Sequence, residues 1–181
     1  MLEDKNIHKF KCKMDLTYEQ YIHACYDGII QLSRELEQIL GRKKTLEIIG
    51  RAQEKHDLEL VRKHLYGRKP IKNFKDFKAF MKELHESPFT SHLFTIKYLH
   101  DTATEIEFHT TECLLAKVFR DMKAADLGYV MICRPDFITT PSYCQNVHLK
   151  RTRTLMQGDD CCDTTYCFSD TSSNSETSAS S

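Results

Sequence analysis

Apolar residues recur at helical spacing through the first half of the chain. The first such run begins at Thr17, where Thr-Tyr-Glu-Gln fits a capping box, a pair of reciprocal side-chain and backbone hydrogen bonds at a helix start. Apolar positions then return every three or four residues until Gly41, a residue typical of helix ends. The same spacing predicts a second helix over residues 44–66 and a third that begins at Asn73 and stops before Pro88.

From residue 92 onward, apolar residues recur at every second position. Residues 92–100 and 104–110 alternate between apolar and polar side chains on either side of a short turn, which predicts an antiparallel hairpin. A helix is predicted directly afterwards, over about residues 111–123, with Thr110 as its cap. A shorter helix should follow over about residues 126–133.

Two further strands are predicted near the end of the patterned region, over residues 147–156 and 161–168, after a loop at 139–144. Helices therefore come mainly first and strands mainly second, with the strands in antiparallel pairs. The pattern predicts an α+β domain in which N-terminal helices pack on one face of a small antiparallel sheet of about four strands.

The chain has 181 residues, and residues 17–168 have the size of a single domain. Residues 1–16 carry little pattern and are interpreted as an N-terminal arm. Residues 169–181 are rich in serine and have almost nothing to bury, so a disordered tail is expected. The 26 basic residues balance the 26 acidic ones, which favours neither nucleic acid nor membrane as a partner. The oligomeric state cannot be read from this pattern.

The N-terminus is charged and lacks the apolar stretch of a secretory signal. No apolar run approaches the roughly 20 residues that a membrane span needs. We therefore expect a cytoplasmic protein. In that compartment the eight cysteines are expected to be thiols rather than disulfides.

Residues capable of chemistry concentrate between Phe108 and Phe168, a segment that holds most of the cysteines. Arg151 and Arg153 would share one face of the predicted 147–156 strand with aliphatic side chains. One interpretation is that both guanidinium groups reach the rim of the sheet and pair with carboxylates. The other is that one of them binds an anionic group of a substrate through a bidentate fork.

Two cysteines are candidate nucleophiles. Cys113 falls in the first turn of a predicted helix, where the dipole and free N–H groups stabilise a thiolate. Cys162 lies on the last predicted strand, on the face opposite to Asp163. A packed, unreactive thiol is the alternative for both. No cysteines have C-x-x-C spacing, so no cofactor is required, although distant residues could still form a site for zinc or another divalent metal.

The segment resembles the L-2-amino-thiazoline-4-carboxylic acid hydrolase family. The resemblance lies in four short stretches, which are Thr111-Glu112-Cys113, Cys133-Arg134-Pro135-Asp136, Arg151-Thr152-Arg153-Thr154-Leu155, and Gly158-Asp159 before Cys162-Asp163. It implies a small-molecule hydrolase in which water opens a cyclic isothiourea, or related cyclic amidine, and leaves an N-carbamoyl amino acid.

Such a reaction needs a carboxylate for the ring amidine, an arginine for the substrate carboxylate, and either a thiolate or a water activated by a base. The resemblance suggests Asp159 or Asp163 for the amidine, Asp136 or Glu112 as base, Arg151 or Arg153 for the carboxylate, and Cys113 or Cys162 as nucleophile. The alternative is a non-catalytic sensor module that binds a small ligand or a metal through the same residues.

Overall fold

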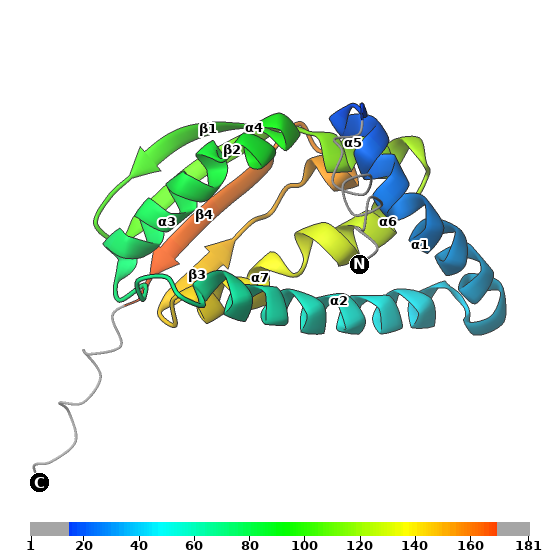
Figure 1. The fold of residues 1–181 in the computed structure, drawn as a ribbon, viewed down its shortest axis with the longest axis horizontal. Helices are drawn as coiled ribbons and strands as arrows, with labels where there is room; N and C mark the ends of the chain where they lie inside the picture. Colours follow the sequence, from blue (N-terminus) through cyan, green and yellow to red (C-terminus); the bar gives the residue numbers. More distant parts are fainter. Residues whose placement is uncertain (1–14, 170–181) are drawn as a thin grey trace, which may run out of the picture.

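Helices form the first half of the described chain, and the four strands lie in the second half, as the apolar pattern predicted. A computed structural model describes residues 15–169, so most of the expected arm and tail lies outside the described residues (Figure 1). The helical elements are α1 (Tyr18–Leu40), α2 (Arg42–Leu65), α3 (Phe74–Glu86), α4 (Pro88–Leu93), α5 (Leu114–Asp121), α6 (Ala125–Gly128), the π-helical turn η2 (Tyr129–Cys133), α7 (Asp136–Tyr143) and the 3-10 turn η3 (Leu155–Gln157).

The predicted helix signals act as expected. Thr17 Oγ1 accepts a hydrogen bond from the Gln20 backbone N–H at 3.2 Å, and the Gln20 side chain accepts one from the Thr17 N–H at 2.9 Å, which completes the capping box. Gly41 ends α1 with a φ of 77°, and α2 starts at the next residue. The Asn73 side chain caps α3 by accepting from the Asp76 N–H at 2.9 Å.

The four strands form one antiparallel sheet in the order β1-β2-β4-β3. Their bounds are β1 (Phe94–Asp101), β2 (Glu105–Cys113), β3 (Val147–Lys150) and β4 (Cys162–Phe168). The α+β prediction is therefore confirmed, and the structure adds the strand order. The register places Cys162 opposite Thr110, close to the end of β2 that leads to Cys113.

Two apolar clusters hold the layers together. In the first, α3 lies along one face of the sheet (Figure 1) and buries its aromatic stripe against strand residues, namely Phe74, Phe77 and Met81 against Ile106, Phe108, Val147, Leu149 and Tyr166. In the second, α1 and α2 pack around α5, α6 and η2 through residues such as Ile30, Ile49, Phe119 and Leu127. The cavity described below borders both clusters.

Several predicted boundaries were wrong. The chain after Pro88 forms α4, and the loop expected at 139–144 belongs to α7, which packs between α2 and β3 even though Pro141 lies inside it. Strand β2 continues to Cys113, so Cys113 itself caps α5 in place of Thr110. Strand β3 ends at Lys150 and not near residue 156.

The early end of β3 has a local cause. The Asp163 carboxylate accepts hydrogen bonds from the backbone N–H groups of Thr152 and Arg153 at 2.9 and 2.6 Å. These bonds take the place of the backbone hydrogen bonds that would continue the strand. The side chain of Arg151, just after the end of β3, donates to Asp136. Among the described residues, no helix has the length and apolar character needed to cross a membrane.

Candidate functional site

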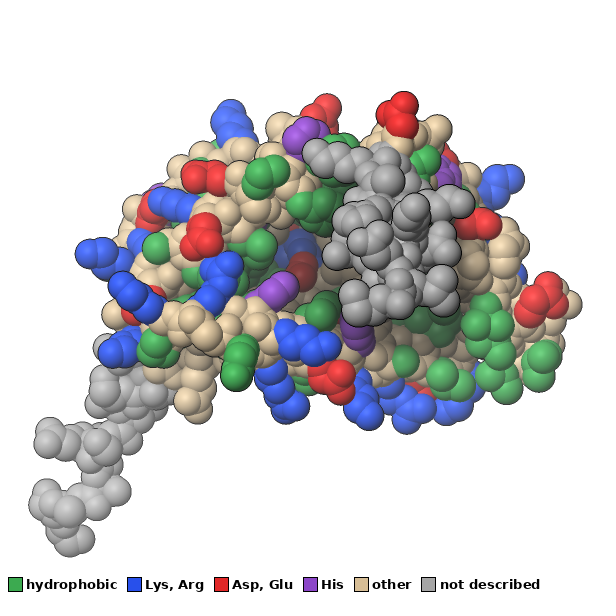
Figure 2. Space-filling view, in the orientation of Figure 1, with side chains coloured by type: hydrophobic (Ala, Val, Ile, Leu, Met, Phe, Trp, Pro, Cys, Tyr) green, Lys and Arg blue, Asp and Glu red, His purple; other side chains and the backbone are tan. Residues whose placement is uncertain are grey.

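A cavity of about 280 Å³ lies between α3, the sheet, η2 and α7. Its apolar wall includes Met81, Phe94, Phe108 and Ile132. Its polar groups come from distant parts of the chain and include Cys113, Cys133, Asp136, Arg151 and Cys162, with His85 on α3. On the face seen in Figure 2, the surface is hollowed near its centre, and acidic and basic side chains lie deep in the hollow.

The most deeply placed charge in this cavity is Arg151, whose side chain is 8% exposed. Its Nη1 donates to Asp136 Oδ2 at 2.9 Å, and its Nη2 donates to the Cys133 carbonyl. The guanidinium carbon lies 5.3 Å from the centre of the Phe137 ring. The Nε atom is buried and has no hydrogen-bond partner among the described residues. One donor of a buried guanidinium is therefore free to bind a ligand.

Helix ends position the two acceptors of Arg151. Asp136 begins α7, and the Cys133 carbonyl closes η2. The last carbonyls of a helix lack partners within the helix, so the Cys133 oxygen can accept from an arginine. Since α7 follows η2 after only Arg134 and Pro135, both acceptors come from one short stretch of the chain.

Asp136 separates the cavity from a second hollow, of about 360 Å³, beneath α2. Its side chain keeps 45% of its surface accessible because it borders both spaces. Burial among protein atoms raises the pKa of Asp136, while Arg151 works in the opposite direction. The carboxyl group is therefore a stronger base than an exposed aspartate.

The thiols of the cavity are protonated at neutral pH. Burial raises the pKa of Cys113 to about 11 and that of Cys133 to about 12, and it also raises the pKa of Cys162. Cys113 Sγ accepts from the Ala116 N–H at 3.2 Å, and Cys162 Sγ accepts from the Leu155 N–H at 3.3 Å. The expectation that the helix start would stabilise a Cys113 thiolate was wrong, because the desolvation of the thiol outweighs these hydrogen bonds.

Half of the residues proposed from sequence thus meet in one cavity, namely Cys113, Asp136, Arg151 and Cys162. Asp163 lies outside it. Burial alone would raise the pKa of this carboxyl group, but hydrogen bonds from Thr152 and Arg153 lower it. Its role here is to fix the backbone next to Arg151.

The other proposed residues lie elsewhere. Arg153 pairs with Asp160 at 2.8 Å on the surface, and its side chain is 41% exposed. Asp159 accepts from the Thr154 N–H at 2.7 Å, within the turn that leads to β4. Arg153 therefore lies at the surface and pairs with a carboxylate, as the first interpretation of the arginine pair expected. Arg151 lies in the cavity, and its binding of an anionic substrate group stays a prediction.

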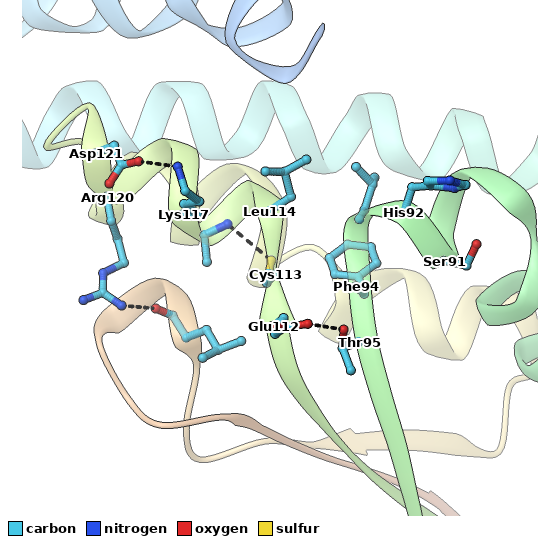
Figure 3. A pocket seen from close by; sticks show the side chains of 13 residues that line it. Ser91, His92, Phe94, Thr95, Glu112, Cys113, Leu114, Lys117, Arg120 and Asp121 are labelled. Carbon is cyan, nitrogen blue, oxygen red and sulfur yellow. Dashed lines mark hydrogen bonds and ion pairs between the residues drawn. The ribbon is translucent and has the colours of Figure 1, made fainter. Parts of the chain in front are cut away.

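Glu112 belongs to a neighbouring outer hollow of about 690 Å³ (Figure 3). There it accepts a hydrogen bond from the Thr95 hydroxyl, while Lys117 pairs with Asp121 at 2.9 Å. Phe94 and Cys113 line both this hollow and the inner cavity. Glu112 is therefore not beside Arg151, although Cys113 lies in the wall between the two spaces.

Sequence reasoning did not identify His85 as a site residue. The residue lines the cavity, and burial lowers its pKa to about 4. Its spacing from Phe77 and Met81 puts it on the buried stripe of α3, so the helical period itself could have identified it.

Metal ligands were left open by the sequence. Within residues 15–169, no three His, Cys, Asp or Glu side chains are grouped so that they could hold a metal ion. The expectation that no cofactor is required stays a prediction.

Comparison with known proteins gives one strong result. A family model described as L-2-amino-thiazoline-4-carboxylic acid hydrolase matches residues 18–166, which include the helical half as well as the segment that carried the resemblance. Comparison with curated proteins finds no match. Among solved structures, the phenol-responsive sensory domain of the transcription activator PoxR, crystallised with phenol, is similar with a TM-score of 0.46 and 16% identity over 87% of this chain and 77% of that chain.

Proposed function

The chain belongs to the L-2-amino-thiazoline-4-carboxylic acid hydrolase family, and from this premise we propose that its Arg151 cavity binds a small cyclic amidine carboxylate and opens the ring by hydrolysis. The observation that carries the proposal is the buried ion pair of Arg151 and Asp136 in a cavity of about 280 Å³. Its volume lies near the lower end of the range for small-molecule pockets, which suits a ligand of about ten heavy atoms.

Arg151 is the proposed carboxylate-binding residue. A buried donor without a partner is unfavourable by about 1–3 kcal/mol, and the Nε atom of Arg151 is such a donor. A ligand carboxylate could accept from this Nε and from a neighbouring Nη atom at once, in the bidentate geometry that guanidinium groups favour.

Asp136 is the proposed partner of the ring amidine and of the attacking water. Only its Oδ2 contacts Arg151, so Oδ1 can accept from an amidine N–H or from water. Water adds to the carbon between sulfur and nitrogen, and one of its protons passes through the carboxylate to the ring nitrogen as the C=N bond becomes single. The remaining hydroxyl of this intermediate then loses its proton as the carbonyl forms and the C–S bond breaks, and the departing sulfur takes that proton to become the thiol of an N-carbamoyl amino acid.

The thiols of the cavity have a different proposed role. With pKa values of about 11 and 12, Cys113 and Cys133 hold almost no thiolate at neutral pH, which favours water over a cysteine as the attacking group. We assign the three cysteines to the polarisable wall that surrounds the sulfur of the ligand.

The same protonated thiols also suit the alternative function, a sensor module that binds its ligand without changing it. Binding would again use Arg151 and Asp136. The two functions differ in their product, because only the hydrolase releases a new thiol.

The deciding experiment is a turnover assay with 2-amino-thiazoline-4-carboxylate beside a panel of small cyclic amidines, with the N-carbamoyl product detected by mass spectrometry. Arg151→Lys keeps the positive charge but loses the bidentate donor geometry of the guanidinium, and should reduce turnover by about 100-fold. Arg153→Lys is the matched control outside the cavity and should behave as wild type. Cys113→Ala and Cys162→Ala should keep most of the activity.

The outcomes separate the alternatives. Saturable binding that depends on Arg151 but gives no product would favour the sensor module. Absence of both binding and turnover would remove the proposal. Stoichiometric metal in the purified protein, with unfolding by a chelator, would instead indicate a metal site.

A further inference from the structure

His85 has a hydrogen-bonding arrangement that the proposed mechanism does not use. The residue lies in the last turn of α3, and its ring packs against the Phe108 ring in a T-shaped arrangement, with 4.9 Å between ring centres and an interplanar angle of 72°. Its Nδ1 lies 2.8 Å from the hydroxyl of Tyr98 on the edge strand β1. The His85 ring thus contacts an aromatic ring on one side and a phenol hydroxyl on another.

The Tyr98 contact determines which ring nitrogen carries the proton. A neutral imidazole has one N–H group and one acceptor nitrogen, and the partner of one nitrogen fixes the state of the other. Tyr98 keeps its proton, because burial and the nearby carboxylates of Glu86 and Asp101 raise its pKa to about 12. A phenol O–H is a better donor than a neutral imidazole N–H, so Tyr98 donates and Nδ1 accepts. The proton of His85 then lies on Nε2.

The remaining nitrogen is the one available to the cavity. His85 lines that space, whereas Tyr98, which holds Nδ1, is not among its lining residues. Within the described part of the chain, Nε2 makes no hydrogen bond, while Nδ1 does. A fixed N–H donor is therefore available to a cavity whose charged residues are Arg151 and Asp136.

We propose that Tyr98 locks His85 as a neutral Nε2–H donor that binds an acceptor atom of the ligand. Arg151 offers a charged fork for a carboxylate, while His85 offers one uncharged donor, suited to a carbonyl oxygen or a ring nitrogen or sulfur with a free lone pair. A neutral imidazole that polarises a bound acceptor in this way is a known catalytic device in other enzymes. His85 thus selects ligands that carry a neutral acceptor as well as an anion, and this selection rests on the proposed function of the cavity.

The test is nitrogen-detected NMR of the full chain labelled with ¹⁵N in its histidine rings. At neutral pH the His85 signals, identified by their loss in His85→Gln, should show protonated Nε2 and accepting Nδ1. Tyr98→Phe should mix the two tautomers. A ring protonated at Nδ1, or a tautomer that Tyr98→Phe leaves unchanged, would overturn the inference.

Adding 2-amino-thiazoline-4-carboxylate should shift the His85 Nε2 resonance. His85→Phe, which has no donor, should bind this compound about tenfold more weakly, while His85→Gln, which keeps an N–H donor, should stay within about threefold of wild type. Equal binding by all three proteins would also overturn the inference. If the wild type does not bind the compound, the proposed function fails, and the ligand-free tautomer measurement still decides the inference on His85 and Tyr98.

Discussion

Removal of the Asp136 carboxylate should lower the free energy of unfolding more than removal of a carboxylate at the surface. Asp136→Ala leaves the guanidinium of Arg151 in a site where its side chain is 8% exposed, with the Cys133 carbonyl as its remaining hydrogen-bond acceptor. An unpaired buried charge typically costs 3–5 kcal/mol. Because Asp136 itself is 45% exposed to the two hollows, water can enter the gap, and we expect a loss of about 3 kcal/mol.

Urea unfolding followed by circular dichroism measures this loss. With a slope of about 2 kcal/mol per molar urea, the midpoint should fall by about 1.5 M. Arg151→Met replaces the charge with an apolar chain of similar length, and the double variant Asp136→Ala/Arg151→Met should regain about 2 kcal/mol relative to the sum of the single changes.

The matched control is the surface pair Arg153–Asp160, whose separation of 2.8 Å is close to that of the buried pair but whose side chains are 41% and 79% exposed. Its double-mutant cycle should give a coupling energy that urea unfolding does not resolve from zero. Equal coupling energies for the two pairs, or a loss below about 1 kcal/mol for Asp136→Ala, would refute the burial argument.

Three further predictions concern His85, two glycines and Cys113. Since the folded pKa of His85 is lowered to about 4, the unfolded chain binds its proton first, and the stability of wild type relative to His85→Gln should fall by about 2 kcal/mol from pH 7 to 4.5 in urea unfolding. A Cβ at Gly50 would lie 1.9 Å from Arg134 Nη2, so Gly50→Ala should lower Tm by about 5 °C, whereas Gly28→Ala, with nothing within 4 Å, should raise it. With a pKa of about 11, Cys113 should be alkylated by iodoacetamide at pH 7.5 at least about 100-fold more slowly than free cysteine, as peptide mass spectrometry can follow.

The sequence predicted those parts of the fold that depend on local chemistry. The capping box at Thr17, the Asn73 cap and the alternation in β1 and β2 are readable because each involves residues a few positions apart. Helix α7 was missed because packing between α2 and β3 outweighs the loop signal of Thr140-Pro141.

The site was predictable only in part, for a similar reason. The sequence offered Asp136 as a candidate base and Arg151 or Arg153 as the arginine of the site, but the choice between the two arginines depended on where β3 ends, which the Asp163 hydrogen bonds determine. The state of Cys113 depended on burial by distant elements, which outweighs the local effect of a helix start.

The most direct test of the central claim is a crystal structure of the protein with 2-amino-thiazoline-4-carboxylate or its N-carbamoyl product. The account predicts the ligand carboxylate within hydrogen-bond distance of Arg151 Nε and the amidine or carbamoyl group beside Asp136. A ligand bound outside this cavity, or inside it with its carboxylate away from Arg151, would contradict the account.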